Sequence, residues 1–361
     1  MSEAFAAVPE QEEAKRLLAA ALAEGPAHAY LLHGPPGIGK RALALAFAGA
    51  LIGSPERVGR GTHPDLYVLE PLGDQIRIDA IRELRRDLHM RPFEADRRVY
   101  VLFAAESMNE DAADALLKDL EEPPPYAVIV LVADDLGPLP ETIRSRCQLV
   151  PFRRLSERAM RTAVAARAPG LDGAQTTALA RLAGGRLDRL DRLLDPDEVK
   201  HRDELLALAR GVYADADFDA AAAARTVLDA AGAHGAKAKE HEETLIENVE
   251  LTKTETDQRL RRAQRGAERE QLLLTLEELA AWYRDLVVVA AGAESAVVHA
   301  DRLNELREDG VRERMIAAER AAEIVREAWR TFEEFNVTPQ LWFEALFLQL
   351  RREFGATIAF A

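Results

Sequence analysis

The residues best suited to chemistry form one glycine-rich stretch near the start of the chain, Gly34-Pro35-Pro36-Gly37-Ile38-Gly39-Lys40-Arg41. Its spacing matches G-x-x-x-x-G-K, in which backbone N–H groups converge on phosphate oxygens and the lysine ammonium reaches the outer phosphates. The next position normally carries a Ser or Thr hydroxyl that ligates Mg²⁺. Here it carries Arg41, a fixed cation that cannot ligate a metal. The stretch therefore predicts a phosphate-binding loop with impaired chemistry, formed by Gly34, Gly37, Gly39, Lys40 and Arg41.

A second contact to the metal is also missing. In a site that hydrolyses nucleotides, a buried strand beside the loop ends in an Asp-Glu pair, where Asp holds Mg²⁺ and Glu polarises the attacking water. The strand predicted at 97–103 is followed by Ala104-Ala105-Glu106. Glu106 is either a displaced remnant of this pair or, as is usual near a helix start, a solvated helix cap. We expect no required cofactor and at most weak binding of ATP or ADP.

Apolar periodicity places the loop in a domain of alternating strands and helices. Strand patterns occur at 29–32, 62–69, 97–103, 127–132 and 147–152, and helix patterns at 11–23, 40–52, 78–90 and 110–120. The segment 53–61 is polar and glycine-rich, which is typical of a loop. Such alternation predicts a parallel sheet sandwiched by helices. Beyond residue 152 the signals are helical, so the predicted fold is α/β plus all-α.

Composition limits the classes of protein to which the chain can belong. A length of 361 residues predicts two or three domains. No apolar run is long enough to span a bilayer, and the acidic first residues do not form a signal peptide, so we expect a cytoplasmic protein. The single cysteine, Cys147, excludes an internal disulfide and a cysteine-rich zinc cluster. A net charge of −15 argues against a surface that binds nucleic acid throughout, although it leaves room for a local basic path.

Four motifs together carry a resemblance to a known family. They are G-P-P-G-I-G-K, G-T-H-P-D, N-E-D-A-A-D-A-L-L-K-D-L-E-E-P-P and T-I-R-S-R-C-Q, which begin at Gly34, Gly61, Asn109 and Thr142. Over about 1–152 the chain resembles the clamp-loader branch of the AAA+ proteins, and within it the delta-prime family of bacterial DNA polymerase III subunits. The A-L-L-K-x-L-E-E-P-P run followed by S-R-C carries most of the specificity, since unrelated nucleotide hydrolases share the phosphate loop. The late segment N-V-T-P-Q-L-W-F-E-A-L-F is similar to the C-terminal collar of that family.

The resemblance implies a clamp-loader subunit that helps to load the sliding clamp onto primed DNA during replication, as a component of the DNA-directed DNA polymerase III holoenzyme. The implied partners are subunits of delta and tau/gamma type, with the clamp and primer–template DNA reached through the complex, and no membrane. The implied domains are an AAA+ phosphate-loop domain at 1–152, a small helical lid at 153–196, and a helical collar for oligomerisation at 197–361. Many relatives hold zinc through four cysteines after the loop helix. The corresponding 53–61 has none, so no zinc is expected.

Arg146 in the S-R-C motif is the candidate catalytic residue. An arginine at the end of a strand-bound loop, at the edge of a subunit, can place its guanidinium on a γ-phosphate held by a neighbouring subunit. By the resemblance Arg146 is that arginine finger, acting in trans. The alternative is an ordinary surface arginine paired with Glu141. The other motif residues are expected to be structural: Lys118, Glu121, Glu122, Ser145 and Cys147.

Two functions stay open at this point. The first is an assembly subunit that donates Arg146 while its own ATPase site is degenerate. The second is a catalytically active AAA+ ATPase in DNA replication or repair, with Glu106 and Arg186 in unusual roles. AAA+ lids carry a second nucleotide-sensing arginine at the place that corresponds to 184–194. The register we prefer aligns it with Asp188, and a shifted register offers Arg186 or Arg189 instead.

Two features of the C-terminal part remain. The charged stretch 237–270 predicts a solvated helical hairpin or a partly disordered arm. Its arginines could contact DNA, but such runs are usually solvated helix faces: Arg259, Arg261, Arg262, Arg265 and Arg269. On the last helix an apolar stripe is expected to be buried, within its own bundle or in a subunit collar: Leu341, Trp342, Ala345, Leu346 and Leu350.

Overall fold

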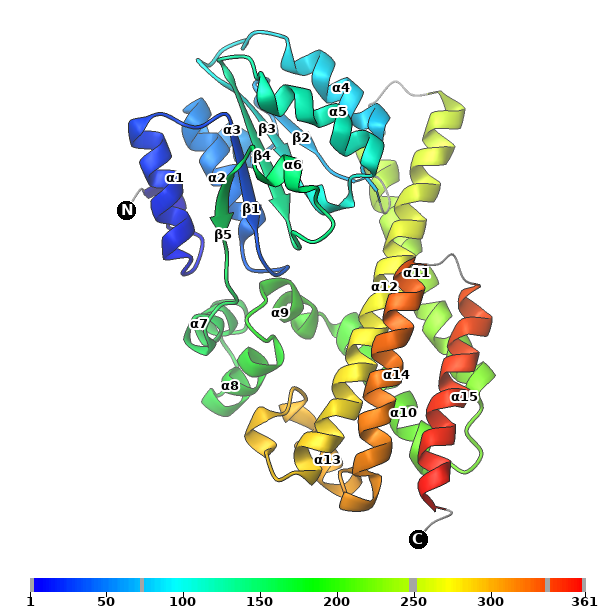
Figure 1. Ribbon diagram of the computed structural model, residues 1–361. Helices are drawn as coiled ribbons and strands as arrows, with labels where there is room; N and C mark the ends of the chain where they lie inside the picture. Colours follow the sequence, from blue (N-terminus) through cyan, green and yellow to red (C-terminus); the bar gives the residue numbers. More distant parts are fainter. Residues whose placement is uncertain (1–2, 72–74, 247–251, 335–337, 359–361) are drawn as a thin grey trace. The chain divides into compact units, whose positions relative to one another are not determined.

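The computed structural model describes residues 3–71, 75–246, 252–334 and 338–358 (Figure 1). The chain divides into two compact units, each with its own core. The N-terminal unit comprises Met1–Arg167 and Ala183–Arg189, and the C-terminal unit comprises Ala168–Leu182 and Leu190–Ala361. The finer division at 152 and 196 stays a prediction.

The N-terminal unit contains a five-stranded parallel sheet in the order β2-β3-β4-β1-β5. Its strands are β1 (Ala29–His33), β2 (Leu66–Leu69), β3 (Arg98–Leu102), β4 (Ala127–Ala133) and β5 (Gln148–Pro151). β3 and β4 are buried along their whole length, as expected of central strands covered on both faces. Because all strands are parallel, the segments that follow β1, β3 and β4 meet at one edge of the sheet.

Helices cover both faces of this sheet, which confirms the predicted fold class (Figure 1). Alternate strand residues point to opposite faces, so Tyr30 and Leu32 pack with α1 and α2, whereas Leu31 packs with α4 and α5. The helices of this unit are α1 (Glu12–Glu24), α2 (Lys40–Ile52), α3 (Pro55–Gly59), α4 (Ile78–Leu88), α5 (Glu110–Glu121), α6 (Glu141–Arg144) and α7 (Glu157–Arg167), with the 3-10 turns η1 (Glu3–Phe5) and η2 (Ala105–Ser107).

The expectation of a loop over 53–61 was wrong in part, because α3 occupies its middle. Pro55 stands at the first turn of α3, where its missing N–H is not needed, and Val58 is buried. One buried apolar residue is too weak a periodic signal to mark a helix of this length from the sequence.

The G-T-H-P-D motif has a structural role that the sequence did not reveal. Asp65 is fully buried, and its carboxylate accepts the backbone N–H groups of Phe93, Glu94 and Ala95. Burial opposes ionisation, but these three hydrogen bonds outweigh it and lower the pKa of Asp65. The motif therefore anchors the loop that leads into β3.

Helices and short 3-10 turns are the regular secondary structure of the C-terminal unit in its described residues. Its helices are α8 (Gly173–Leu182), α10 (Pro196–Ala214), α11 (Ala220–Ile246), α12 (Lys253–Ala290), α13 (Leu303–Asp309), α14 (Met315–Glu334) and α15 (Pro339–Ile358), with η3 (Glu294–Ala296), η4 (Ala300–Arg302) and η5 (Arg312–Arg314). α9 (Leu187–Leu194) spans the division between the units. The core is rich in aromatic residues and includes Trp282, Tyr283, Phe343 and Phe347. None of the helices in the described ranges is long and apolar enough to cross a bilayer.

The charged stretch 237–270 is a helical hairpin where it is described, formed by the end of α11 and the start of α12. Residues 247–251 between the two helices lie outside the described residues. Of the two interpretations left open by the sequence, the hairpin is therefore the one that the structure supports.

The stripe predicted on the last helix was partly wrong. Leu346 and Leu350 are buried in the bundle, but Leu341 is 67% exposed and Ala345 is exposed too. The buried face of α15 is formed instead by Phe343, Leu346, Phe347, Leu350 and Phe354. Apolar residues surround most of this helix, so periodicity could not select the face that packs. Asn336 and Val337 of the collar-like motif lie outside the described residues.

Candidate functional site

The predicted phosphate loop connects β1 to α2 and depends on its glycines. Gly34, Gly37 and Gly39 all have positive φ angles, of 139°, 67° and 96°. A Cβ atom on Gly34 would lie 2.4 Å from the carbonyl oxygen of Phe152, so no larger residue fits there. The backbone therefore has the conformation that the sequence motif requires.

The ammonium group of Lys40 makes all of its hydrogen bonds to acceptors of its own chain. Its side chain is only 5% exposed, and Nζ donates to the carbonyl oxygens of Gly34 and Pro35. Nζ also lies 2.7 Å from Oδ1 of Asp134, the first residue after β4. An ammonium has three donors, and here each has an acceptor. A phosphate entering the loop has to displace at least one of them.

Arg41 does not take over the role of the Ser or Thr hydroxyl that usually follows the lysine. Its Nη2 lies 2.5 Å from Oε1 of Glu70, which follows β2, and its guanidinium stacks over the ring of Phe103, 4.1 Å from the centroid. Glu70 and Phe103 both stand at the carboxyl edge of the sheet, next to the loop. The position that should ligate Mg²⁺ is thus occupied by a paired cation.

The segment after β3 also lacks a metal-holding carboxylate. Ala104, at the expected position, has a left-handed backbone with φ 48° and ψ 49°, which is strained for a residue with a side chain. It leads into the turn η2 that carries Glu106.

Glu106 is half-buried and connects η2 to the residue that follows β4. Its Oε1 accepts the N–H of Asp134 at 3.1 Å, and its Oε2 is buried without a hydrogen-bond partner among the described atoms. Burial raises the pKa of Glu106. The helix α5 is capped by Asn109 instead, so the interpretation of Glu106 as a solvated helix cap was wrong.

The segment 183–189 belongs to the N-terminal unit and lies directly against the loop. The N–H of Leu187 donates to the carbonyl oxygen of Gly37 at 2.6 Å, and a Cβ atom on Gly37 would lie 1.6 Å from Oδ1 of Asp188. The Arg186 guanidinium forms an ion pair with Asp188 at 2.8 Å. Asp188, which the preferred register aligns with the sensing arginine, therefore contacts the loop, and Arg186 is paired with it.

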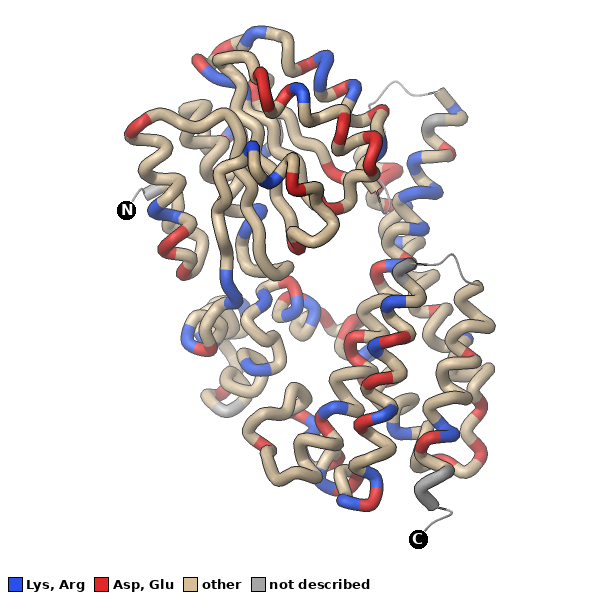
Figure 2. Tube along the Cα trace, viewed as in Figure 1, with Lys and Arg blue, Asp and Glu red and all other residues tan. Residues whose placement is uncertain are grey.

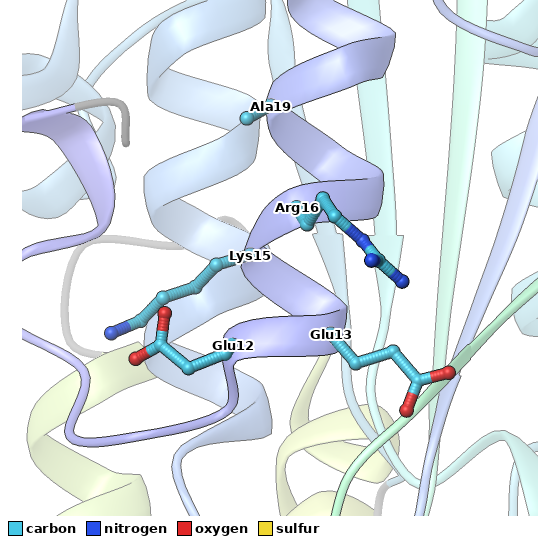
Figure 3. A pocket seen from close by; sticks show the side chains of 5 residues that line it. All are labelled: Glu12, Glu13, Lys15, Arg16 and Ala19. Atoms are coloured by element: carbon cyan, nitrogen blue, oxygen red, sulfur yellow. The ribbon is translucent and has the colours of Figure 1, made fainter.

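A hollow beside the loop was not foreseen from the sequence. It is lined by the N-terminal segment, by α7 and by the start of α9: Ala7, Pro9, Glu10, Arg158, Ala159, Thr162, Ala163, Ala166, Arg167 and Leu187. No spacing or residue type marks these positions as a set, because three segments distant in sequence contribute. A second hollow runs along α1 and is lined by Glu12, Glu13, Lys15, Arg16 and Ala19 (Figure 3). It contains none of the predicted site residues.

Arg146 lies between α6 and β5 and is held by two acceptors. Its Nε donates to Oε1 of Glu121 at 2.9 Å, its Nη2 binds the same oxygen, and its Nη1 donates to the carbonyl oxygen of Thr142 at 2.8 Å. The predicted alternative partner, Glu141, was wrong, because the acidic partner comes from the end of α5. The Arg146 side chain is 32% exposed.

The remaining motif residues lie on the same two chain segments as Arg146 and Glu121. Ser145 donates its hydroxyl to the carbonyl oxygen of Thr142 at 3.1 Å, and Glu122 closes α5 by donating its N–H to the carbonyl oxygen of Lys118. Burial raises the pKa of the Cys147 thiol to about 12, so the thiol is not a nucleophile at neutral pH. In the described ranges, no group of three or more His, Cys, Asp and Glu side chains is placed to hold a metal ion.

Comparison with known proteins assigns a family to this part of the chain. Residues 10–156 match the model of a family described as DNA polymerase III, delta subunit. The chain is 37% identical over 202 residues to DNA polymerase III subunit delta' of Pseudomonas aeruginosa, covering 51% of this chain and 53% of that protein. Over residues 10–156 the chain is therefore similar to the delta-prime family. The prediction drawn from the four motifs is confirmed.

Two further relatives are also subunits of DNA polymerase III. Subunit delta' of Bacillus subtilis is 35% identical over 145 residues, which cover 37% of this chain and 44% of that protein. Subunit tau of DNA polymerase III from the same organism is 30% identical over 166 residues, which cover 42% of this chain and 29% of that protein. The chain thus spans about half or less of the length of these relatives.

Proposed function

We propose that this protein is a delta-prime-type subunit of a DNA polymerase III clamp loader, which helps to load the sliding clamp onto primed DNA. The observation that carries the proposal is the match of residues 10–156 to the delta-prime family. Its role is that of an assembly partner and arginine donor. Its own nucleotide site does not turn over.

The degenerate state of this site is supported by the pairing of its charges. Lys40 is bound to Asp134, Arg41 to Glu70, and Arg186 to Asp188. These three cations are therefore each paired with a carboxylate of the same unit, and neither position that should bind Mg²⁺ offers a ligand. Bringing in a nucleotide requires breaking these pairs with no metal to compensate for the phosphate charge.

The role of Arg146 as an arginine finger is supported by the exposure of its side chain and by the small energy of its ion pair with Glu121. Ion pairs at a surface contribute only about 0–1 kcal/mol, so a γ-phosphate of a neighbouring subunit can replace Glu121 as the partner of the guanidinium. The planar fork that now binds Glu121 and the Thr142 carbonyl also fits phosphate oxygens.

Assembly through the C-terminal unit, as a collar, is supported by an exposed apolar face of α15. Leu341, Ala345 and Leu348 recur at helical spacing and are all exposed, with Leu341 at 67% and Leu348 at 50%. We propose that subunits of delta and tau/gamma type cover this face. We also propose that the lid comprises residues 153–196 and the collar residues 197–361.

One experiment tests the proposed function in two steps. The purified chain is first assayed for Mg²⁺-dependent ATP hydrolysis, and is then mixed with the delta and tau/gamma subunits of the same organism and assayed for assembly and clamp loading. We expect negligible turnover alone, and clamp loading that requires this chain. Turnover that Lys40→Ala abolishes would indicate the alternative, an active AAA+ ATPase. Failure to co-elute with the other subunits would refute the clamp-loader proposal.

A further inference from the structure

The hairpin of α11 and α12 extends past the end of α14 within the C-terminal unit. The guanidinium carbon of Arg269 lies 5.6 Å from the ring centroid of Phe332, near the last residue of α14, Glu334. The residues of α12 before Arg269 therefore continue beyond α14, for about 20 Å at 1.5 Å per residue. We call 232–246 of α11 and 253–266 of α12 the arm.

The two helices of the arm pack closely against each other, so the arm is rigid. A Cβ atom on Gly235 would lie 2.5 Å from Cγ of Glu268 and 3.0 Å from the carbonyl oxygen of Gln264. Further along, Arg259 of α12 forms an ion pair with Glu242 of α11. The small residues of α11 thus allow the backbone of α12 to approach, and the arm holds its outward side chains in a fixed register.

The outward side of the arm carries cations without acidic partners. From Gln258 to Ala267 there are four arginines and no Asp or Glu, in a chain with a net charge of −15. Arg259 is paired, whereas the structure gives no ion pair or hydrogen bond for the side chains of Arg261, Arg262 and Arg265 in its described part. Arg261 and Arg265 are exposed and Arg262 is half-buried. Figure 2 shows this basic segment on α12.

The spacing of these arginines suits a polyanion. Arg261 and Arg265 stand four residues apart, about 6 Å along the helix and on the same side, with Arg262 beside them. The residues between and around them are Gln258, Ala263, Gln264 and Gly266. An ordinary protein interface has an apolar core, and the residues around these arginines on α12 do not provide one; the exposed Leu245 of the arm lies on α11.

We propose that the arm binds the phosphate backbone of nucleic acid through Arg261, Arg262 and Arg265. The planar guanidinium matches phosphate oxygens two at a time. Contacts of this kind position a protein without reading bases, so the binding is independent of sequence and sensitive to salt. Nothing in this inference depends on the ATP site or on Arg146.

The experiment measures binding of the full chain to a fluorescent DNA duplex by anisotropy over a series of salt concentrations. In one variant Arg261, Arg262 and Arg265 are replaced by Gln, which keeps a good helix propensity. Each lost phosphate contact removes about 0.9 from the slope of log K against log salt, so the slope should fall by about 2.7. The matched control replaces Arg312, Arg326 and Arg352, three exposed arginines of the same unit, by Gln.

The outcomes separate the proposal from its alternatives. A smaller slope in the arm variant with an unchanged slope in the control supports it, and a variant with Lys at the three positions should keep most of the slope. Equal losses in both Gln variants would indicate a general charge effect and overturn it. If the wild-type chain does not bind the duplex at low salt, or if polyglutamate displaces the duplex at equal charge, the arm does not recognise nucleic acid.

Discussion

Arg146 is the residue whose chemistry can be tested most directly. Its guanidinium is held by Glu121 and by the carbonyl oxygen of Thr142. The exposed pair with Glu121 is weak enough for a phosphate to replace it, and a guanidinium can stabilise charge on a transferring phosphoryl group. The pairing with Glu121 brings the E-E-P-P and S-R-C motifs together in space.

We predict that Arg146→Ala reduces the DNA- and clamp-stimulated ATPase of the assembled complex while leaving folding and incorporation intact. Arginine fingers contribute about 10³–10⁵ in rate at the site that they serve, but other sites keep theirs, so the overall loss is partial. Arg146→Lys should not restore the rate, because an ammonium lacks the planar fork. Steady-state ATPase of assemblies checked by gel filtration provides the measurement. Arg153→Ala, at an exposed arginine of the same unit, is the control, and equal rates for Arg146→Ala and Arg153→Ala would contradict the role.

At the scale of elements, a buried charged network fixes the segment after α12. His299 is fully buried, with Nδ1 2.8 Å from Oδ2 of Asp285 and Nε2 3.2 Å from Oε1 of Glu278. The same Asp285 oxygen accepts the N–H groups of Val298 and His299. Burial works against the charged imidazole, but the two carboxylates outweigh it and raise the pKa of His299.

This network predicts a pH dependence of stability. Because the pKa of His299 is raised in the folded chain, its stabilising contribution is complete below the unfolded value of about 6.5 and is lost as the pH rises through the folded value. His299→Gln should lower the free energy of unfolding most at low pH. It should also remove the loss of stability that the titration of His299 causes as the pH rises. Urea unfolding followed by tryptophan fluorescence over a pH series measures it, with the exposed His241→Gln as control. A wild-type profile identical in shape to that of His299→Gln would rule the network out as its cause.

At the scale of the whole molecule, the exposed face of α15 allows the proposed assembly to be tested. Replacing Leu341 and Leu348 by Gln removes exposed apolar area without touching the buried Phe343 and Phe347. We predict unchanged thermal stability and weaker co-elution with the delta and tau/gamma subunits, because burial of apolar surface stabilises such interfaces. Ile316→Gln, at another exposed apolar residue of the C-terminal unit, is the matched control. Undiminished assembly of the double variant would place the interface elsewhere.

The sequence by itself determined the features that depend on local pattern. The glycine spacing of 34–39, the absence of a hydroxyl at Arg41 and of a carboxylate at Ala104, and the alternation of strands and helices can all be read along the chain, because each is set by neighbouring residues. The motifs were sufficient to predict the family.

Only the tertiary structure decided which side chains meet. Glu70 and Asp134 follow β2 and β4, whose carboxyl ends meet at one edge of the parallel sheet, and there they pair with Arg41 and Lys40 of the loop. Asp188 comes from the distant segment 183–189 and contacts the loop at Gly37. The partner of Arg146 and the buried face of α15 were missed for the same reason. An ion pair between distant segments, or the choice of face on a helix that is apolar nearly all round, depends on packing that no local pattern encodes.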